Sequence, residues 1–228
     1  MKKLFKSKNN ESVEKIIVRD MPTSSIAERY RTVRVNIDLN LNGGQIKTLM
    51  VTSAKKLEGK TTTVSNLAVS FAQQGKKVLL VNADLRNPKV EAGYQIDKQE
   101  GLSNLLTRNK ILEDVIKKTD VENLWLLPSG SVASHPSDLL SSQIMKDLIR
   151  ELSANFELIL FDCPPILEFS DAKVIGTLCD ACVLVVKNNK TEKDHLTMAK
   201  VLLERTHVKL LGLVITHVSR KEIDAYGF

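Results

Sequence analysis

The sequence predicts an α/β fold in which a doubly wound, mostly parallel sheet carries helices on both faces. Short apolar runs rich in Val, Ile and Leu are typical of buried parallel strands. They occupy residues 48–53, 77–83, 124–129, 158–163, 182–187 and 210–216. Helical patterns lie between these runs, and strand–helix alternation implies βαβ units with right-handed crossovers. The 228 residues are enough for one well-cored domain of this class.

Two helices are predicted in the first half of the chain. A polar helix is expected within residues 23–40, before the first strand. From Thr61 to Ala72 apolar residues recur at helical spacing, and Gly75 suits a C-terminal stop. This second helix follows the strand at 48–53 after a short loop.

Two further helices are predicted in the second half. The stretch 137–156 repeats the apolar spacing, with Ser137 as the expected N-cap. The stretch 191–207 does so again, with Thr191 as the expected N-cap. Acidic residues follow Thr191 in the first turn, where the helix dipole favours them.

Composition and charge limit the classes of function. A formal net charge of +6 permits contact with phosphates or an anionic membrane face. Aromatic residues make up 4% of the chain, which argues against the stacking platforms that bind single-stranded nucleic acid. No apolar run approaches the ~20 residues of a membrane span, and no signal peptide is evident, so we expect a cytoplasmic protein without a nucleic-acid partner. The basic run at 1–10 is either a solvated terminus or a docking tail for lipid or an acidic partner.

The three cysteines are predicted to be buried and structural. An odd number without a signal peptide argues against a disulfide framework. Cys179 and Cys182 have the spacing of a redox pair, but they lead into an apolar run, whereas a redox pair usually caps a helix. We expect the same structural role for Cys163.

The stretch 51–67, VTSAKKLEGKTTTVSNL, ends like a phosphate-binding loop. A strand precedes it and a helix follows, as such a loop requires. Lys60 is expected to reach the terminal phosphates, and Thr61 to give its hydroxyl to Mg²⁺. Backbone N–H groups near Gly59 would hold the anion at the start of the helix.

Two acidic segments are predicted to complete this site. VLLVNADLR places Asn82, Asp84 and Arg86 just past one buried strand, and LILFDCPP places Asp162 at the end of another. Ligands of a doubly wound sheet bind at the carboxyl ends of its strands, where carboxylates can hold Mg²⁺. Taken singly, each Asp could also be a solvated or capping residue. Together with the loop they converge on ATP or GTP with Mg²⁺.

With these motifs the sequence resembles the bacterial tyrosine kinases, a branch of the P-loop ATPases related to septum-site and chromosome-partitioning ATPases. The resemblance covers nearly the whole chain. The family's loop reads close to S-x-x-P-G-E-G-K-[ST], which is matched by Ser53, Glu58, Gly59, Lys60 and Thr61. ADLR matches the family's additional acidic motif, DCPP is similar to its D-T-P-P, and Lys55 stands where partitioning ATPases keep a second lysine.

The resemblance extends to the segments on either side. ERYRTVR carries Glu28, Arg31 and Arg34 at the spacing of the family's E-x-x-R-x-x-R. On a helix these three lie on one broad face, which in the family contacts the neighbouring subunit of a ring. A solvated charged helix is the alternative. SGSVASHPSDLLSS and SDAKVIG resemble the segments that follow later strands in the family.

The resemblance implies a function and partners. The function is ATP- and Mg²⁺-dependent autophosphorylation on tyrosine, which regulates the synthesis and export of capsular or extracellular polysaccharide. The partners are further copies of the chain in a ring, a membrane activator of the polysaccharide co-polymerase type, and a cognate tyrosine phosphatase. The activator would recruit the kinase to the inner face of the membrane.

The resemblance also implies a division of the chain and roles for its residues. Residues 1–45 form a basic arm plus oligomerisation helix, 46–218 the ATPase/kinase domain, and 219–228 a tail with the acceptor tyrosine. The implied catalytic residues are Lys60, Asn82, Asp84 and Arg86. Those implied to bind ATP are Ser53, Lys55, Glu58, Gly59, Lys60, Thr61, Thr62 and Thr216. Metal ligands would be Thr61, Asp84 and Asp162, and the phosphoacceptor Tyr226.

Four departures from the family pattern stand out. Lys56 and Leu57 replace the Pro-Gly of the loop, so Lys56 adds positive charge and Leu57 resists backbone angles that glycine allows. Asn82 replaces an Asp that helps to deprotonate the attacking hydroxyl, and an amide cannot act as that base. The tail offers only Tyr226 in place of a tyrosine cluster. Thr216 lies where the family has an adenine-contacting Asn.

Two other functions stay open beside the kinase. Asn82 and the reduced tail favour a catalytically weak, kinase-like ATP-binding regulator that assembles with the same polysaccharide machinery. Lys55 favours a partitioning or septum-positioning ATPase. Such ATPases lack the E-x-x-R-x-x-R helix, and the final stretch SRKEIDAYGF has no apolar face long enough to enter a membrane.

Overall fold

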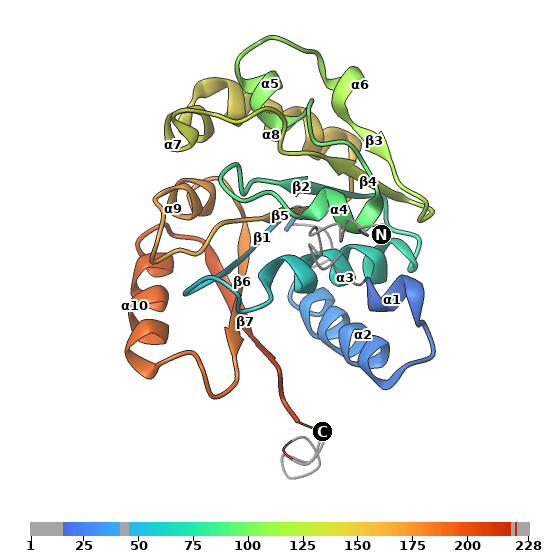
Figure 1. The fold of residues 1–228 in the computed structure, drawn as a ribbon, viewed down its shortest axis with the longest axis vertical. Helices are drawn as coiled ribbons and strands as arrows, with labels where there is room; N and C mark the ends of the chain where they lie inside the picture. Colours follow the sequence, from blue (N-terminus) through green and yellow to red (C-terminus); the bar gives the residue numbers. More distant parts are fainter. Residues whose placement is uncertain (1–15, 42–45, 220–221, 223–228) are drawn as a thin grey trace, which may run out of the picture.

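The computed structural model describes residues 16–41, 46–219 and 222. Figure 1 shows a central sheet with helices on both sides, so the predicted fold class is confirmed. Within the described residues the seven-stranded sheet has the order β3-β4-β2-β5-β1-β6-β7. Its strands are β1 Thr48–Ser53, β2 Val78–Asn82, β3 Lys117–Lys118, β4 Leu124–Leu127, β5 Leu158–Asp162, β6 Ala181–Lys187 and β7 Lys209–Thr216.

The predicted apolar runs all form strands, and the strands in the middle of the sheet are covered on both faces. Every residue of β1, β2 and β5 is buried, which explains continuous apolar runs in place of an alternating pattern. These strands and β6 pair in parallel with their neighbours. The short edge strand β3 is polar, pairs antiparallel with β4 and gave no signal in the sequence.

The helices divide between the two faces of the sheet. They are α1 Ile17–Asp20, α2 Ser25–Asp38, α3 Lys60–Ala72, α4 Val90–Tyr94, α5 Leu102–Leu106, α6 Leu112–Val115, α7 Pro136–Ser141, α8 Gln143–Asn155, α9 Asp171–Gly176 and α10 Lys193–Glu204. Helices α1 to α4 share one hydrophobic core with the sheet, and α5 to α10 share the other. Alternate residues of β1 enter the two cores: Leu49 and Val51 one, Met50 the other.

The predictions for α2 and α3 are confirmed, and the one for residues 137–156 is wrong in detail. That stretch is two helices, because Ser142 is extended and its hydroxyl accepts a hydrogen bond from the Met145 N–H at 3.3 Å, which starts α8. Ser137 is not an N-cap. It lies inside α7, and its hydroxyl donates to Asp171 on α9.

Helix α10 is confirmed, but its predicted cap is not. The helix begins at Lys193 after Glu192, which makes no side-chain capping bond. The Thr191 hydroxyl instead donates to Glu58 Oε1 at 2.6 Å and accepts from the Lys187 N–H at 2.8 Å. The Thr191 side chain, which was predicted to cap α10, therefore bonds to the phosphate loop instead.

The segment before β1 packs onto α3. Ile16 and Val18 are fully buried, and the Val18 N–H donates to the Asn66 side chain at 2.9 Å. At the other end of α2, the Lys76 ammonium lies 2.6 Å from Asp38. These contacts fix α2 beside α3, the helix that begins at the phosphate loop (Figure 1).

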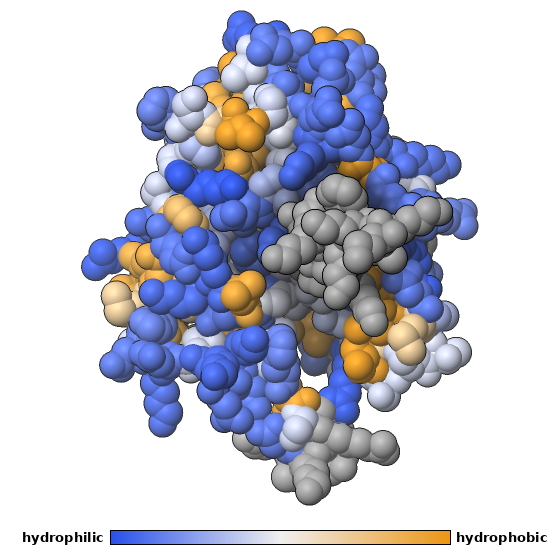
Figure 2. Space-filling model, in the orientation of Figure 1, coloured by the Kyte–Doolittle hydropathy of each residue, from blue (hydrophilic) through white to orange (hydrophobic). Residues whose placement is uncertain are grey.

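The surface and the cysteines agree with the composition. Figure 2 shows hydrophilic side chains over most of one face, with apolar side chains gathered in separate small groups. All three cysteines are free and buried, as predicted, and burial raises the pKa of the Cys163 and Cys179 thiols. None of the helices in the described ranges combines the length and apolar character needed to cross a membrane.

Candidate nucleotide site

The loop between β1 and α3 has the backbone of a phosphate-binding loop. Gly59 sits at the N-cap of α3 with a φ of +93°, and a Cβ built there would lie 3.2 Å from Thr216 Cγ2. Both the angle and the close approach favour glycine. Leu57 has a φ of +63°, the left-handed region that glycine adopts freely. Leu57 thus adopts a backbone angle of the kind that it was expected to resist.

Several residues predicted to bind ATP hold the shape of this loop. Glu58 is buried; its Oε2 accepts from the Lys55 N–H at 3.0 Å and its backbone oxygen accepts from the Thr216 hydroxyl at 2.8 Å. The Ser53 hydroxyl donates to the Lys55 carbonyl at 2.7 Å. The side chain of Glu58 thus joins the loop to Thr191, just before α10, and its backbone joins the loop to β7.

Lys60, Thr61, Asp84 and Asp162, which we call the acidic cluster, meet where β1, β2 and β5 end. The Lys60 ammonium lies 2.8 Å from Asp84 Oδ2 and 3.7 Å from Asp162 Oδ1. The Thr61 hydroxyl donates to Asp162 Oδ2 at 2.8 Å. Parallel register explains the meeting, because Asp162 pairs with both Val51 and Asn82.

Lys60 is the one cation of the acidic cluster, and it faces two carboxylates. Burial acts to lower the pKa of Lys60, but the carboxylates of Asp162 and Asp84 outweigh it and raise the pKa above its ordinary value. Lys60 therefore stays a cation at neutral pH. Among the described residues no group of three His, Cys, Asp or Glu side chains gathers to hold a metal. Two carboxylates and a hydroxyl fit Mg²⁺, which takes few protein ligands and keeps water and phosphate oxygens.

A pocket of about 260 Å³ opens beside the acidic cluster, with Leu57, Lys60, Asp84 and Pro165 in its walls. Lys56 also lines it, but its ammonium lies 3.1 Å from Glu168, so its added charge is compensated.

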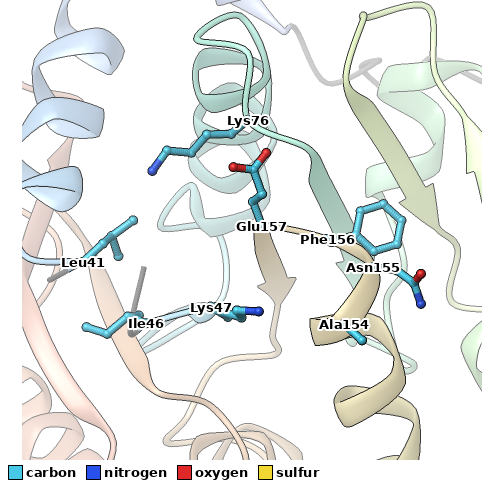
Figure 3. A pocket seen from close by; sticks show the side chains of 8 residues that line it. All are labelled: Leu41, Ile46, Lys47, Lys76, Ala154, Asn155, Phe156 and Glu157. Atoms are coloured by element: carbon cyan, nitrogen blue, oxygen red, sulfur yellow. The ribbon is translucent and has the colours of Figure 1, made fainter. Parts of the chain in front are cut away.

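A second pocket of similar size lies at the opposite end of the strands (Figure 3). Its side chains come from the start of β1 and β5 and the end of α8, and include Lys47, Lys76, Phe156 and Glu157. Lys47 donates to the Ser153 carbonyl at 2.8 Å, and Lys76 pairs with Asp38. Two carboxylates, an ammonium and a hydroxyl meet beside the first pocket, so we place the chemistry there.

Arg86, predicted to be catalytic, pairs with α9 and also feels the charge of Asp84 in the acidic cluster, which helps to raise its pKa. Its guanidinium makes a two-pronged pair with Asp171, with Nε to Oδ2 at 2.7 Å and Nη2 to Oδ1 at 3.1 Å. It also lies 4.7 Å from the centre of the Phe169 ring. Asp171 is fully buried at the start of α9. Arg86 thus fastens the exit of β2 to α9.

Asn82, also predicted to be catalytic, is fully buried and held from both sides. Its amide nitrogen donates to Glu91 at 2.9 Å to each carboxylate oxygen, and its amide oxygen accepts from the Asp84 N–H at 3.1 Å. Glu91 additionally accepts from the Ser129 N–H at 2.8 Å. Glu91 was not predicted as a site residue, because a lone Glu in a short helical turn is usually exposed to solvent. No periodic signal marks it.

The remaining predicted residues lie on α2, in the phosphate loop and at the start of α3. Glu28 and Arg31 pair with each other on α2 at 2.9 Å, and Arg34 is half-buried on the same helix. Lys55 is exposed and Thr62 half-buried at the start of α3. Tyr226 lies outside the described residues.

Known proteins are similar to this chain over nearly its whole length. The AAA domain family matches residues 46–210. The tyrosine-protein kinase YwqD of Bacillus subtilis is 39% identical over 99% of this chain and 95% of its own. The putative tyrosine-protein kinase CapB of Staphylococcus aureus is 34% identical over 97% of each chain. Among solved structures, the chimerical protein CapA2B2 superposes with a TM-score of 0.86 at 33% identity, over 90% of both chains.

These matches agree with the geometry. The matched range begins just before β1 and includes the phosphate loop and both acidic strand ends. The two kinases are similar in length as well as in sequence. By sequence, fold and motif the chain belongs to the bacterial tyrosine-protein kinases, a nucleotide-binding branch of the P-loop ATPases.

Proposed function

We propose that the chain binds Mg²⁺-ATP at the acidic cluster and transfers the terminal phosphoryl group to tyrosine, its own included. The observation that carries the proposal is Lys60, charged and held between Asp84 and Asp162 at the start of α3. Bound Mg²⁺ neutralises phosphate charge as it develops in the transition state. Thr61, Asp84 and Asp162 would hold the cation, and Lys60 would exchange its carboxylate partners for phosphate oxygens.

The loop residues position the nucleotide in this proposal. The backbone N–H groups at the start of α3 face the phosphates, and the helix dipole favours the negative charge. We assign nucleotide binding to Ser53, Lys55, Glu58, Gly59, Lys60, Thr61, Thr62 and Thr216. The contacts of Ser53, Glu58 and Thr216 favour an indirect role for their side chains, because they hold the loop itself.

The acceptor we propose is Tyr226. The chain has three tyrosines. Tyr94 is buried, its hydroxyl donates to the Ser65 carbonyl at 3.2 Å, and burial raises its pKa. Tyr30 lies half-buried on α2. We therefore assign the acceptor to the tail at 219–228, after the kinase domain at 46–218.

Partners and place in the cell follow the family. We propose that residues 1–45 supply the contact between copies, in a ring-like homo-oligomer that uses Glu28, Arg31 and Arg34 of α2. A membrane protein of the polysaccharide co-polymerase type would activate the kinase and recruit it to the inner face of the membrane. A tyrosine phosphatase would reverse the reaction. The process regulated would be the synthesis and export of capsular or extracellular polysaccharide.

An autophosphorylation assay tests the proposal. The purified chain is incubated with Mg²⁺-ATP, with and without the activator's cytoplasmic segment, and phosphotyrosine is mapped by mass spectrometry. We expect phosphate on Tyr226 and none in the Lys60→Met variant. Equal signals from the wild type and Lys60→Met would refute the kinase reaction. Phosphate that persists in Tyr226→Phe would move the acceptor elsewhere.

A catalytically weak assembly regulator is the second candidate, and Asn82 favours it. Its amide is committed to Glu91 and Asp84 and accepts no proton. Under this alternative the wild type binds Mg²⁺-ATP and assembles, as seen by light scattering, but phosphotyrosine stays at the level of Lys60→Met with the activator present.

A further inference from the structure

We propose that Glu91 is a positioning residue for phosphoryl transfer, and that Asn82 and Glu91 form one buried unit that holds Asp84 in place. The inference rests on the kinase function proposed above. Asn82 is 0% exposed at the end of β2, and Glu91 is 2% exposed on α4. Two polar side chains this deeply buried need partners, and each is the other's main partner.

The hydrogen bonds fix which group carries the negative charge. Both oxygens of Glu91 accept hydrogen bonds, from the Asn82 amide and from the Ser129 N–H. A carboxylate offers acceptors alone, which matches the donors that surround Glu91. The unit therefore has its single negative charge on Glu91, away from the pocket, and its neutral member at position 82.

The same bonds fix the direction of the Asn82 amide. Because its nitrogen faces Glu91, its oxygen must face the Asp84 N–H, at 3.1 Å. Asp84 is then held at three points, since its Oδ1 accepts from the Asn87 N–H at 3.0 Å and its Oδ2 meets Lys60 at 2.8 Å. A continuous chain of contacts thus runs from Ser129, after β4, through Glu91 and Asn82 to Asp84 and Lys60.

These hydrogen bonds change the expected effect of an Asn82→Asp substitution. An Asp at position 82 would set two carboxylates about 2.9 Å apart with no donor between them, where like charges repel strongly. The missing base is therefore not restored by Asn82→Asp alone. Exchanging the two functional groups, Asn82→Asp with Glu91→Gln, restores one donor facing one carboxylate, and places the carboxylate nearer the acidic cluster.

A double-mutant cycle tests the unit, with wild type, Asn82→Asp, Glu91→Gln and the double variant in the full chain. Glu113→Gln on α6, an exposed Glu, is the matched control and should behave as wild type. Thermal unfolding, Mg²⁺-ATP affinity, and kcat and KM of autophosphorylation are measured for each. Asn82→Asp should lower the unfolding temperature by about 5 °C, because a buried donor is lost and a charge is added.

Kinetics separate positioning from stability alone. We expect Asn82→Asp and Glu91→Gln each to lower kcat about tenfold with little change in KM, because Asp84 is misplaced and not removed. The double variant should recover the unfolding temperature and reach at least the wild-type kcat. The inference is overturned if Asn82→Asp alone raises kcat, or if the two single effects simply add.

The kinase proposal can fail separately. If the wild type makes no phosphotyrosine, the cycle is decided on unfolding temperature and Mg²⁺-ATP affinity. Non-additive recovery in both measurements supports the unit, and additive losses in either one refute it.

Discussion

Replacing Leu57 with glycine should stabilise the protein, although it removes an apolar side chain. Leu57 has a φ of +63°, which costs a non-glycine residue about 1–2 kcal/mol. Its side chain is 78% exposed, so little packing is lost on removal. Glycine also offsets about 0.4–1 kcal/mol of this gain, because it increases the conformational entropy of the unfolded chain. The balance is a gain of about 1 kcal/mol, or about 2–4 °C in unfolding temperature for a chain of this size.

Leu57→Ala is the control that separates the two contributions. Alanine removes the exposed side chain but keeps the Cβ, and with it the strain of the left-handed backbone. Thermal unfolding of the three proteins, measured by circular dichroism without nucleotide, should rank glycine above wild type and alanine. The reasoning about backbone strain is refuted if Leu57→Gly unfolds at a lower temperature, or if Leu57→Ala gains as much.

Two further predictions concern the contacts around the loop. Burial acts to raise the pKa of Asp171, but hydrogen bonds from Arg86 and Ser137 outweigh it and hold the pKa below its ordinary value. The stabilisation that ionised Asp171 provides is therefore complete above its pKa of about 3.9 in the unfolded chain. It is lost as the pH falls through the lower pKa of Asp171 in the folded protein. Asp171→Asn should make the unfolding temperature less sensitive to acid below about pH 4; an unchanged acid profile contradicts the pairing. Thr191→Val removes the donor to Glu58 Oε1 and should lower the unfolding temperature by about 3–8 °C. Thr197→Val, which alters a helix-surface hydroxyl of α10, should shift it far less, and equal shifts would show that Glu58 does not depend on Thr191.

The sheet and the phosphate loop could be predicted from the sequence because their signals are local. Fully buried parallel strands are continuous apolar runs, and the loop's Gly59, Lys60 and Thr61 are adjacent. The break at Ser142 could not be predicted, since residues 137–156 have one uninterrupted helical pattern. The short helix α4 is too brief to show a period.

The side-chain partners within the site were hidden for a different reason. Arg86 and Asp171 are 85 residues apart, so their pairing appears only when β2 and α9 are placed together. Asn82 and Glu91 are nine residues apart, but only the turn into α4 brings them face to face. The sequence marked Asn82 as a lost base. The fold shows that its amide has a partner whose charge it complements.

The hydrogen bonds of Glu58 also make the phosphate loop depend on residues that are synthesised much later. The loop lies in the first third of the chain, yet Glu58 is bonded to Thr191, 133 residues later, and to Thr216, 158 residues later. Contacts that span so much sequence require long loops to close, which costs entropy and slows folding. A nascent chain that has released α3 but not β7 therefore has the phosphate loop without its bond from Thr216. The shape of the loop that we propose to bind phosphate thus depends on a strand at the far end of the sequence.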